Sequence, residues 1–122
     1  MNFLSHYFLD KEDKRPHFVL GLVLPDLSRN FSKHIRIREH HTHIKFENEF
    51  LEQINDGVKR HLEVDHIFHN SEFFKTNSQY VLTILKKQKF ESITRHQYAL
   101  AHIFLEMMMD RLLINKHKNL CA

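Results

Sequence analysis

Three side chains that could bind a metal ion lie on one face of a predicted helix. They stand four residues apart in the segment HLEVDHIFH, as His61, Asp65 and His69. Residues at this spacing are about one helical turn apart on a single stripe. Imidazole and carboxylate groups are preferred ligands of borderline divalent metals, and a helix holds them rigidly. The pattern therefore indicates a metal site; the alternative is an exposed pair that stabilises the helix by about 0.2–0.5 kcal/mol.

A second group with the same spacing lies in the apolar segment ALAHIFLEMMMDRLL. It consists of His102, Glu106 and Asp110. Carboxylates are almost never buried without a partner, and a charge among Ile, Phe, Leu and Met side chains is costly unless it is paired or bound to a metal. Two such groups in one chain favour metal binding over two unrelated exposed pairs.

The composition narrows the class of protein. The chain has 122 residues, 12 histidines, one cysteine, two glycines, two prolines and a formal net charge of +3. A single cysteine excludes a disulfide or a cysteine-based zinc site within one chain. Low glycine and proline content argues against a turn-rich β-sandwich and against disorder. No basic segment precedes the apolar start, and no apolar run reaches the roughly 18 residues of a membrane span. We therefore expect a cytoplasmic protein with no membrane partner.

The most basic segment is residues 28–43. It contains Arg29, Lys33, Arg36 and Arg38 but few apolar residues, and it is predicted to be an exposed loop or an irregular helix. A net charge of only +3 argues against nucleic-acid binding. The segment is therefore either a solvated face or a site for anions.

Helices are the elements that must position these side chains, because apolar residues recur at helical spacing and no segment offers a strand partner. The predicted helical segments are residues 2–9 (or an extended start), 17–24, 44–55, 58–69, 78–88 and a last helix that ends near residue 114. The expected fold is an all-α bundle of about five or six helices. One domain would span residues 1–114, followed by a polar tail over residues 115–122.

Several residues are expected to end or begin these helices. Pro25-Asp26 would close the second segment, and Gly57 either ends the third or lies inside a longer helix. Asn70-Ser71 offers an N-cap for the helix that follows, and Ser92 or Thr94 offers one for the last helix.

Four short motifs occur in an order that resembles the acyl carrier protein phosphodiesterase family. They are Asn2-Phe3-Leu4-Ser5-His6, Gly21-Leu-Val-Leu-Pro-Asp26, Gly57-Val-Lys-Arg-His61 with the following Asp65, and Asp110-Arg-Leu-Leu. The family's pattern opens with Asn-Phe-Leu-Ala-His, and the family is related to the HD-domain metal-dependent phosphohydrolases. The resemblance spans residues 1–114 and implies an HD-like helical fold.

The resemblance also implies an activity, a cofactor and a partner. The implied enzyme is a metal-dependent phosphoric diester hydrolase, with Mn²⁺ a plausible ion. It would hydrolyse the phosphodiester that joins 4′-phosphopantetheine to a serine of acyl carrier protein. Acyl carrier protein, or another phosphorylated substrate, is then the expected partner.

The resemblance further implies roles for individual residues. The implied metal ligands are Asp26, His61, Asp65 and Asp110. A general base or leaving-group acid would be His6 or His69, because imidazole titrates near neutral pH. The basic side chains that would bind the substrate are Arg29, Lys33, Arg36 and Arg38. Alternative ligands, or supports for the ligands, are His102 and Glu106.

Two other classes of function stay open. One is a shortened, catalytically reduced helical module that binds a partner or forms a homodimer. The length of the chain favours this class, because the family's chains are longer. Three departures from the family's motifs also favour it: Leu62 replaces an Arg, Phe68-His69 replaces Thr-Asp, and Arg111 replaces a His. The other is a metal-binding or storage protein that uses Glu106 with the histidines, although the paired Glu-x-x-His motifs of di-iron bundles are lacking.

Overall fold

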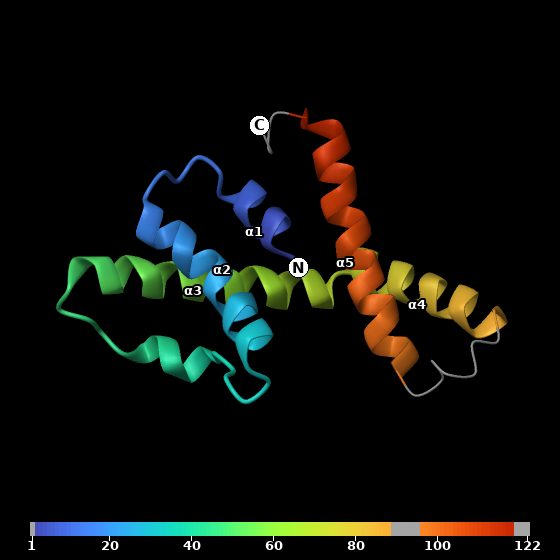
Figure 1. The fold of residues 1–122 in the computed structure, drawn as a ribbon, viewed down its shortest axis with the longest axis horizontal. Helices are drawn as coiled ribbons and strands as arrows, with labels where there is room; N and C mark the ends of the chain where they lie inside the picture. Colours follow the sequence, from blue (N-terminus) through green and yellow to red (C-terminus); the bar gives the residue numbers. More distant parts are fainter. Residues whose placement is uncertain (1, 89–95, 119–122) are drawn as a thin grey trace. The chain divides into compact units, whose positions relative to one another are not determined.

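Figure 1 shows the computed structural model of the chain, which describes residues 2–88 and 96–118. Five α-helices and one 3-10 helix occur in these residues: α1 (Phe3–Leu9), α2 (Pro16–Phe31), η1 (Glu39–His43), α3 (Glu49–Asn70), α4 (Glu72–Lys87) and α5 (Gln97–Lys116). This part of the chain contains no strand, which confirms the predicted all-α class. None of its helices combines the length and the apolar character needed to cross a membrane.

The chain divides into two compact units within helix α3. The N-terminal unit is Met1–Ile67 and the C-terminal unit is Phe68–Ala122. The single HD-like domain over residues 1–114 stays a prediction. Helix α5 continues to Lys116, slightly beyond the predicted end near residue 114. Residues 119–122 of the predicted tail lie outside the described residues.

Helix α2 is longer than its sequence predicts. Pro16 starts the helix, where the missing N–H of proline is not needed. Pro25 lies inside the helix, so the prediction that Pro25-Asp26 closes it was wrong. An interior proline removes one backbone hydrogen bond. Burial of the face formed by Phe18, Leu22 and Pro25 stabilises the helix across this defect.

Helices α2 and α3 meet at a pair of glycines, one in the interior of each helix. A Cβ atom on Gly21 would lie 2.9 Å from Gly57 Cα and would collide with the carbonyl group of Ile54. A Cβ atom on Gly57 would lie 2.8 Å from Gly21 Cα and would collide with the carbonyl group of Phe18. The two backbones are therefore in direct contact, and Gly57 continues α3 rather than ending it.

The connection between α2 and α3 is fixed to α3 by the buried side chain of Asn55. Its Nδ2 donates hydrogen bonds to the carbonyl oxygens of Thr42 and Ile44, both at 3.1 Å. The backbone N–H of Phe46 donates to Glu52 Oε2 at 2.9 Å. The basic segment 28–43 comprises the end of α2, a non-helical stretch and η1, and these bonds hold its C-terminal part against α3.

In the C-terminal unit, α4 packs against α5. Ser71 caps α4, since its Oγ accepts a hydrogen bond from the Phe74 N–H at 3.1 Å, and this predicted cap is confirmed. The buried apolar residues of this unit are Phe68, Leu82, Ala101 and Leu105. Ser92 and Thr94, the predicted caps of the last helix, lie outside the described residues.

Substitution of Gly57 by alanine tests the contact between α2 and α3. Alanine favours an isolated helix over glycine by about 1 kcal/mol. At this position, however, the methyl group would push against the backbone of α2, and overpacking costs about 1–3 kcal/mol. We expect Gly57→Ala to lower the Tm measured by circular dichroism. Gln53→Ala, also on α3, is the control and should change stability by no more than about 0.5 kcal/mol. A higher Tm for Gly57→Ala would show that the helices do not touch there.

Candidate metal centre

His6, His61 and Asp65 converge in the N-terminal unit. Nε2 of His6 lies 3.0 Å from Asp65 Oδ1, and Nε2 of His61 lies 3.4 Å from Asp65 Oδ2. The ligand atoms of the three residues are all within 4.8 Å of one another. Zinc-type bonds of about 2.0–2.2 Å in tetrahedral geometry separate the ligand atoms by about 3.3–3.6 Å. Small side-chain rotations would therefore bring all three onto one ion.

A hydrogen bond to α2 sets the orientation and tautomer of His61. Its Nδ1 lies 2.7 Å from the carbonyl oxygen of Leu22. A carbonyl oxygen can only accept, so Nδ1 is the nitrogen that carries the proton. The other ring nitrogen, Nε2, faces Asp65 and is the atom available to a metal ion. Metal-binding histidines are oriented by outer hydrogen bonds of this kind.

His6 packs flat against His61. The ring centroids are 3.9 Å apart with an interplanar angle of 18°, and the two residues are 1% and 2% exposed. Close stacking of two buried rings restricts their rotation and keeps both beside Asp65. Two imidazoles beside a carboxylate are a donor set suited to a divalent cation.

Asp26 faces the same group from α2. Its Oδ1 lies 3.9 Å from His61 Nε2, and its Oδ2 is buried without a hydrogen-bond partner among the described residues. Burial raises the pKa of Asp26, although the nearby His61 opposes this effect. A buried carboxylate oxygen without a partner is costly, and a bound cation would remove that cost. The residues present therefore fit a metal ion.

Asp65 differs from Asp26 in its electrostatic surroundings. Burial by itself would raise the pKa of Asp65, but hydrogen bonds with His6 and His61 act in the opposite direction, and the pKa lies far below its ordinary value. Asp65 is therefore ionised at neutral pH and supplies negative charge at the centre of the group.

A cavity of about 310 Å³ opens onto these ligands. Its lining combines metal-binding side chains with cationic ones: Asp26, His61 and Asp65 with Arg29, Arg36 and Arg38. Lys33, the fourth basic residue of the predicted substrate site, lines a neighbouring hollow with Arg36 and Arg38. The structure thus brings three of the four predicted cationic residues to the cavity that the candidate ligands line.

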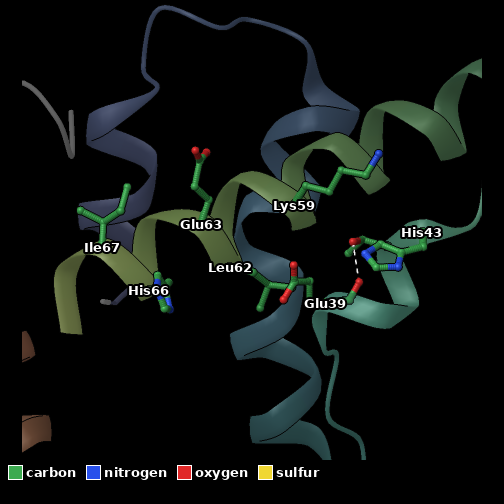
Figure 2. Close-up of a pocket in the computed structure, with 8 residues that line it drawn as sticks. Glu39, His43, Lys59, Leu62, Glu63, His66 and Ile67 are labelled. Carbon is green, nitrogen blue, oxygen red and sulfur yellow. Dashed lines mark hydrogen bonds between the residues drawn. The ribbon is translucent and has the colours of Figure 1, made fainter. Parts of the chain in front are cut away.

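A larger cavity of about 740 Å³ lies between η1 and α3 in the same unit (Figure 2). Leu62 lines both cavities, so the two are neighbours. The larger cavity has a lining of mixed charge: Glu39, Thr42, His43, Lys59, Leu62, Glu63, His66 and Ile67. The Thr42 hydroxyl donates to the carbonyl oxygen of Glu39 at 2.6 Å, which closes the turn of η1 at this edge.

The C-terminal unit contains a second group of metal-binding type: His69, His102 and Glu106. The structure therefore divides the predicted stripe His61, Asp65 and His69 between the two groups. Asp110 lies on α5 and belongs to neither group. Its predicted role as a ligand together with Asp26, His61 and Asp65 stays a prediction.

Sequence reasoning missed the roles of four residues that support the first group. The Leu22 carbonyl has no sequence signature, since any residue supplies a carbonyl oxygen. Gly21 and Gly57 appear in the motifs, but nothing in their spacing shows that they touch. Asn55 is a polar residue within an otherwise amphipathic helix. Buried polar side chains need hydrogen-bond partners, and this requirement is the one signal in the sequence that Asn55 could hold another segment in place.

Comparison with protein-family models, with curated proteins and with solved structures finds no match for this chain.

The two carboxylates should affect the stability of the metal-free protein in opposite directions. The folded-state pKa of Asp26 is raised, so its charged form disfavours folding above its ordinary pKa of 3.8, and Asp26→Asn should stabilise the protein at pH 7. The pKa of Asp65 is lowered, so its charge contributes stability that is present above pH 3.8 and lost as the pH falls. Asp65→Asn should therefore destabilise the protein at pH 7, by about 1–3 kcal/mol.

Urea unfolding in the presence of a chelator at pH 7 measures both effects. The Asp26 effect should shrink as the pH falls toward 3.8, whereas the Asp65 effect should persist at pH 4 and shrink only at lower pH. Equal signs for the two variants would show that the surroundings of the two carboxylates do not differ in this way.

Proposed function

We propose that the chain is a metal-dependent phosphohydrolase whose site lies in the N-terminal unit. One observation carries this proposal: a single cavity is lined by the candidate ligands Asp26, His61 and Asp65 and by three arginines. Carboxylates and imidazoles bind a divalent ion, and guanidinium groups bind phosphate oxygens, often through paired hydrogen bonds. The combination of these two kinds of side chain in one cavity supports a site for a phosphate ester.

The proposed ligands are His6, His61, Asp65 and Asp26. His6 has its Nε2 directed at Asp65 and is 1% exposed, which suits a ligand better than the general base expected from the sequence. The chemistry that a divalent ion supplies in such a site is polarisation of a phosphoryl oxygen and activation of a water near neutral pH. The catalytic role of His69 stays a prediction, because the observed partners of its ring nitrogen are in the second group.

The basic side chains are proposed to bind the substrate rather than the metal ion. Arg29, Arg36 and Arg38 are exposed and line the cavity, so they can bind the non-reacting phosphate oxygens as the substrate enters. Lys33 extends the positive surface next to them. Such a surface attracts phosphorylated or acidic substrates over a range set by the ionic strength.

A phosphodiester is the substrate class we favour. The neighbouring cavity of about 740 Å³ offers room for an organic group attached to the phosphate. The resemblance of the motifs to acyl carrier protein phosphodiesterases supports the 4′-phosphopantetheine diester of acyl carrier protein as the specific substrate. An acidic carrier protein would also complement the charge of Lys33, Arg36 and Arg38.

Hydrolysis of bis(p-nitrophenyl) phosphate by tag-free protein with Mn²⁺ tests the activity. We expect turnover that a chelator abolishes and that Asp65→Asn lowers by about 100-fold or more, since even residues that only support metal ligands cost about 10–100-fold when changed. Lys75→Gln, an exposed charge change on α4, is the control and should leave turnover unchanged. Absence of turnover of this diester and of holo-acyl carrier protein, in protein that binds the metal, would contradict the proposal.

The arginines should act on binding more than on chemistry. We expect Arg36→Gln to raise KM by about 10-fold or more with a smaller change in kcat, because a hydrogen bond to a charged group contributes about 1.5–3 kcal/mol. The increase should shrink at high salt. Steady-state kinetics at two ionic strengths measure it, and an unchanged KM would remove Arg36 from the substrate site.

One observation favours the alternative of a non-catalytic module that forms a homodimer. Several large apolar side chains of α5 are 49–61% exposed: Ile103, Phe104, Met107 and Leu112. Exposed apolar surface of this kind is typical of interaction sites. Light scattering that gives the mass of a stable dimer, together with no diester hydrolysis, would favour this alternative over the enzyme.

A further inference from the structure

The second group is arranged around a single carboxylate oxygen. Nε2 of His102 lies 2.8 Å and Nε2 of His69 lies 3.4 Å from the same Oε1 of Glu106. His102 and Glu106 are one turn apart on α5, and His69 comes from the last turn of α3. The ligand atoms of a tetrahedral zinc site are about 3.3–3.6 Å apart. One distance already falls in this range, and the other needs only a small outward movement.

Phe74 holds the two imidazole rings in this arrangement. Its ring meets His69 edge-on at a centroid distance of 4.8 Å and His102 at 5.0 Å, with interplanar angles of 70° and 75°. The two imidazole rings are 4.7 Å apart. Such contacts restrict ring rotation, so both Nε2 atoms stay directed at Glu106. This restriction lowers the entropy cost of binding an ion.

Glu106 brings a negative charge into this partly apolar setting. Its side chain is 12% exposed. Burial by itself would raise the pKa of Glu106, but the hydrogen bond from His69 and the interaction with His102 oppose this effect, and the pKa is lowered. The group therefore presents an ionised carboxylate to two imidazole nitrogens at neutral pH.

We propose that His69, His102 and Glu106 bind a divalent ion of the zinc class, and that this ion joins the last turn of α3 to α5. Two histidines and one glutamate are an established zinc ligand set, which leaves a fourth position for water. Two imidazoles favour zinc over Mg²⁺ and Ca²⁺, which prefer oxygen ligands. The side chains of His69 and His102 are 31% and 40% exposed, so solvent and ion can reach the site. On binding, each imidazole keeps its remaining proton on Nδ1 and uses Nε2 for the metal.

The proposal concerns the C-terminal unit alone and does not rest on the proposed hydrolase activity. Because the ligands come from two helices of that unit, an ion that binds only the folded state stabilises it by mass action. The expected effect of the ion is therefore stabilisation of the packing of α5.

Zinc stoichiometry of the tag-free, full-length chain tests the proposal. After removal of metal, titration with Zn²⁺ against a chromophoric chelator should show two equivalents bound to the wild type. His102→Gln should bind one equivalent, since the amide can still hydrogen-bond Glu106 but is a poor zinc ligand. Asp65→Asn should also bind one, and the double variant none. His96→Gln, which changes an exposed histidine before α5, is the control and should keep both equivalents.

The results for the two sites are separable. If the first site fails and the second holds, the wild type binds one equivalent and His102→Gln binds none. In Asp65→Asn, where only the second site is left, added Zn²⁺ should raise the Tm, and this rise should vanish in the double variant. A folded His102→Gln that binds as much zinc as the wild type would overturn the proposal.

A gain-of-signal variant covers the case in which His102→Gln fails to fold. His102→Cys should give a thiolate-to-metal charge-transfer band in the near ultraviolet when Co²⁺ is added. Absence of that band in folded His102→Cys would also overturn the proposal.

Discussion

The contact between α2 and α3 at Gly21 and Gly57 is the constraint on which the N-terminal site depends. With no side chain between the backbones, the helices approach closely enough for His61, one turn after Gly57, to hydrogen-bond the Leu22 carbonyl at 2.7 Å. That bond fixes the ring and leaves Nε2 facing Asp65. Any larger residue at either glycine would separate the helices and break this orientation before it affected a ligand directly.

Burial makes the same site costly for the protein without a bound cation. His6 and His61 are almost completely buried, and Asp26 keeps a buried oxygen that has no hydrogen-bond partner in the described part of the chain. Arrangements of this kind lower stability, and they persist at functional sites where a ligand restores the balance. The contrast between Asp65, with a lowered pKa, and Asp26, with a raised one, follows from their hydrogen bonds. Asp65 is hydrogen-bonded to both imidazoles, whereas Asp26 has only longer-range interactions with them.

The two groups of ligands have different surroundings, which is why we assign them different roles. The first opens onto a cavity lined by three arginines, whose guanidinium groups suit phosphate oxygens. The second is packed against Phe74 between the end of α3 and α5, where a bound ion would connect the two helices. The two proposals together involve four of the 12 histidines, with His6 and His61 in one group and His69 and His102 in the other.

The sequence by itself determined the helical class, the cap at Ser71 and most of the ligand candidates, because these depend on residue types and on spacings of three to four residues. Local pattern could not show that α2 continues through Pro25, since burial of its apolar face outweighs the lost hydrogen bond. Nor could it separate His69 from Asp65, because both lie on one stripe of α3. Only the tertiary structure brought His6 to Asp65, 59 residues away. Contacts between residues so far apart in the sequence depend on how closely the helices pack. Here Gly21 and Gly57, which are unremarkable in the sequence, set the spacing between α2 and α3.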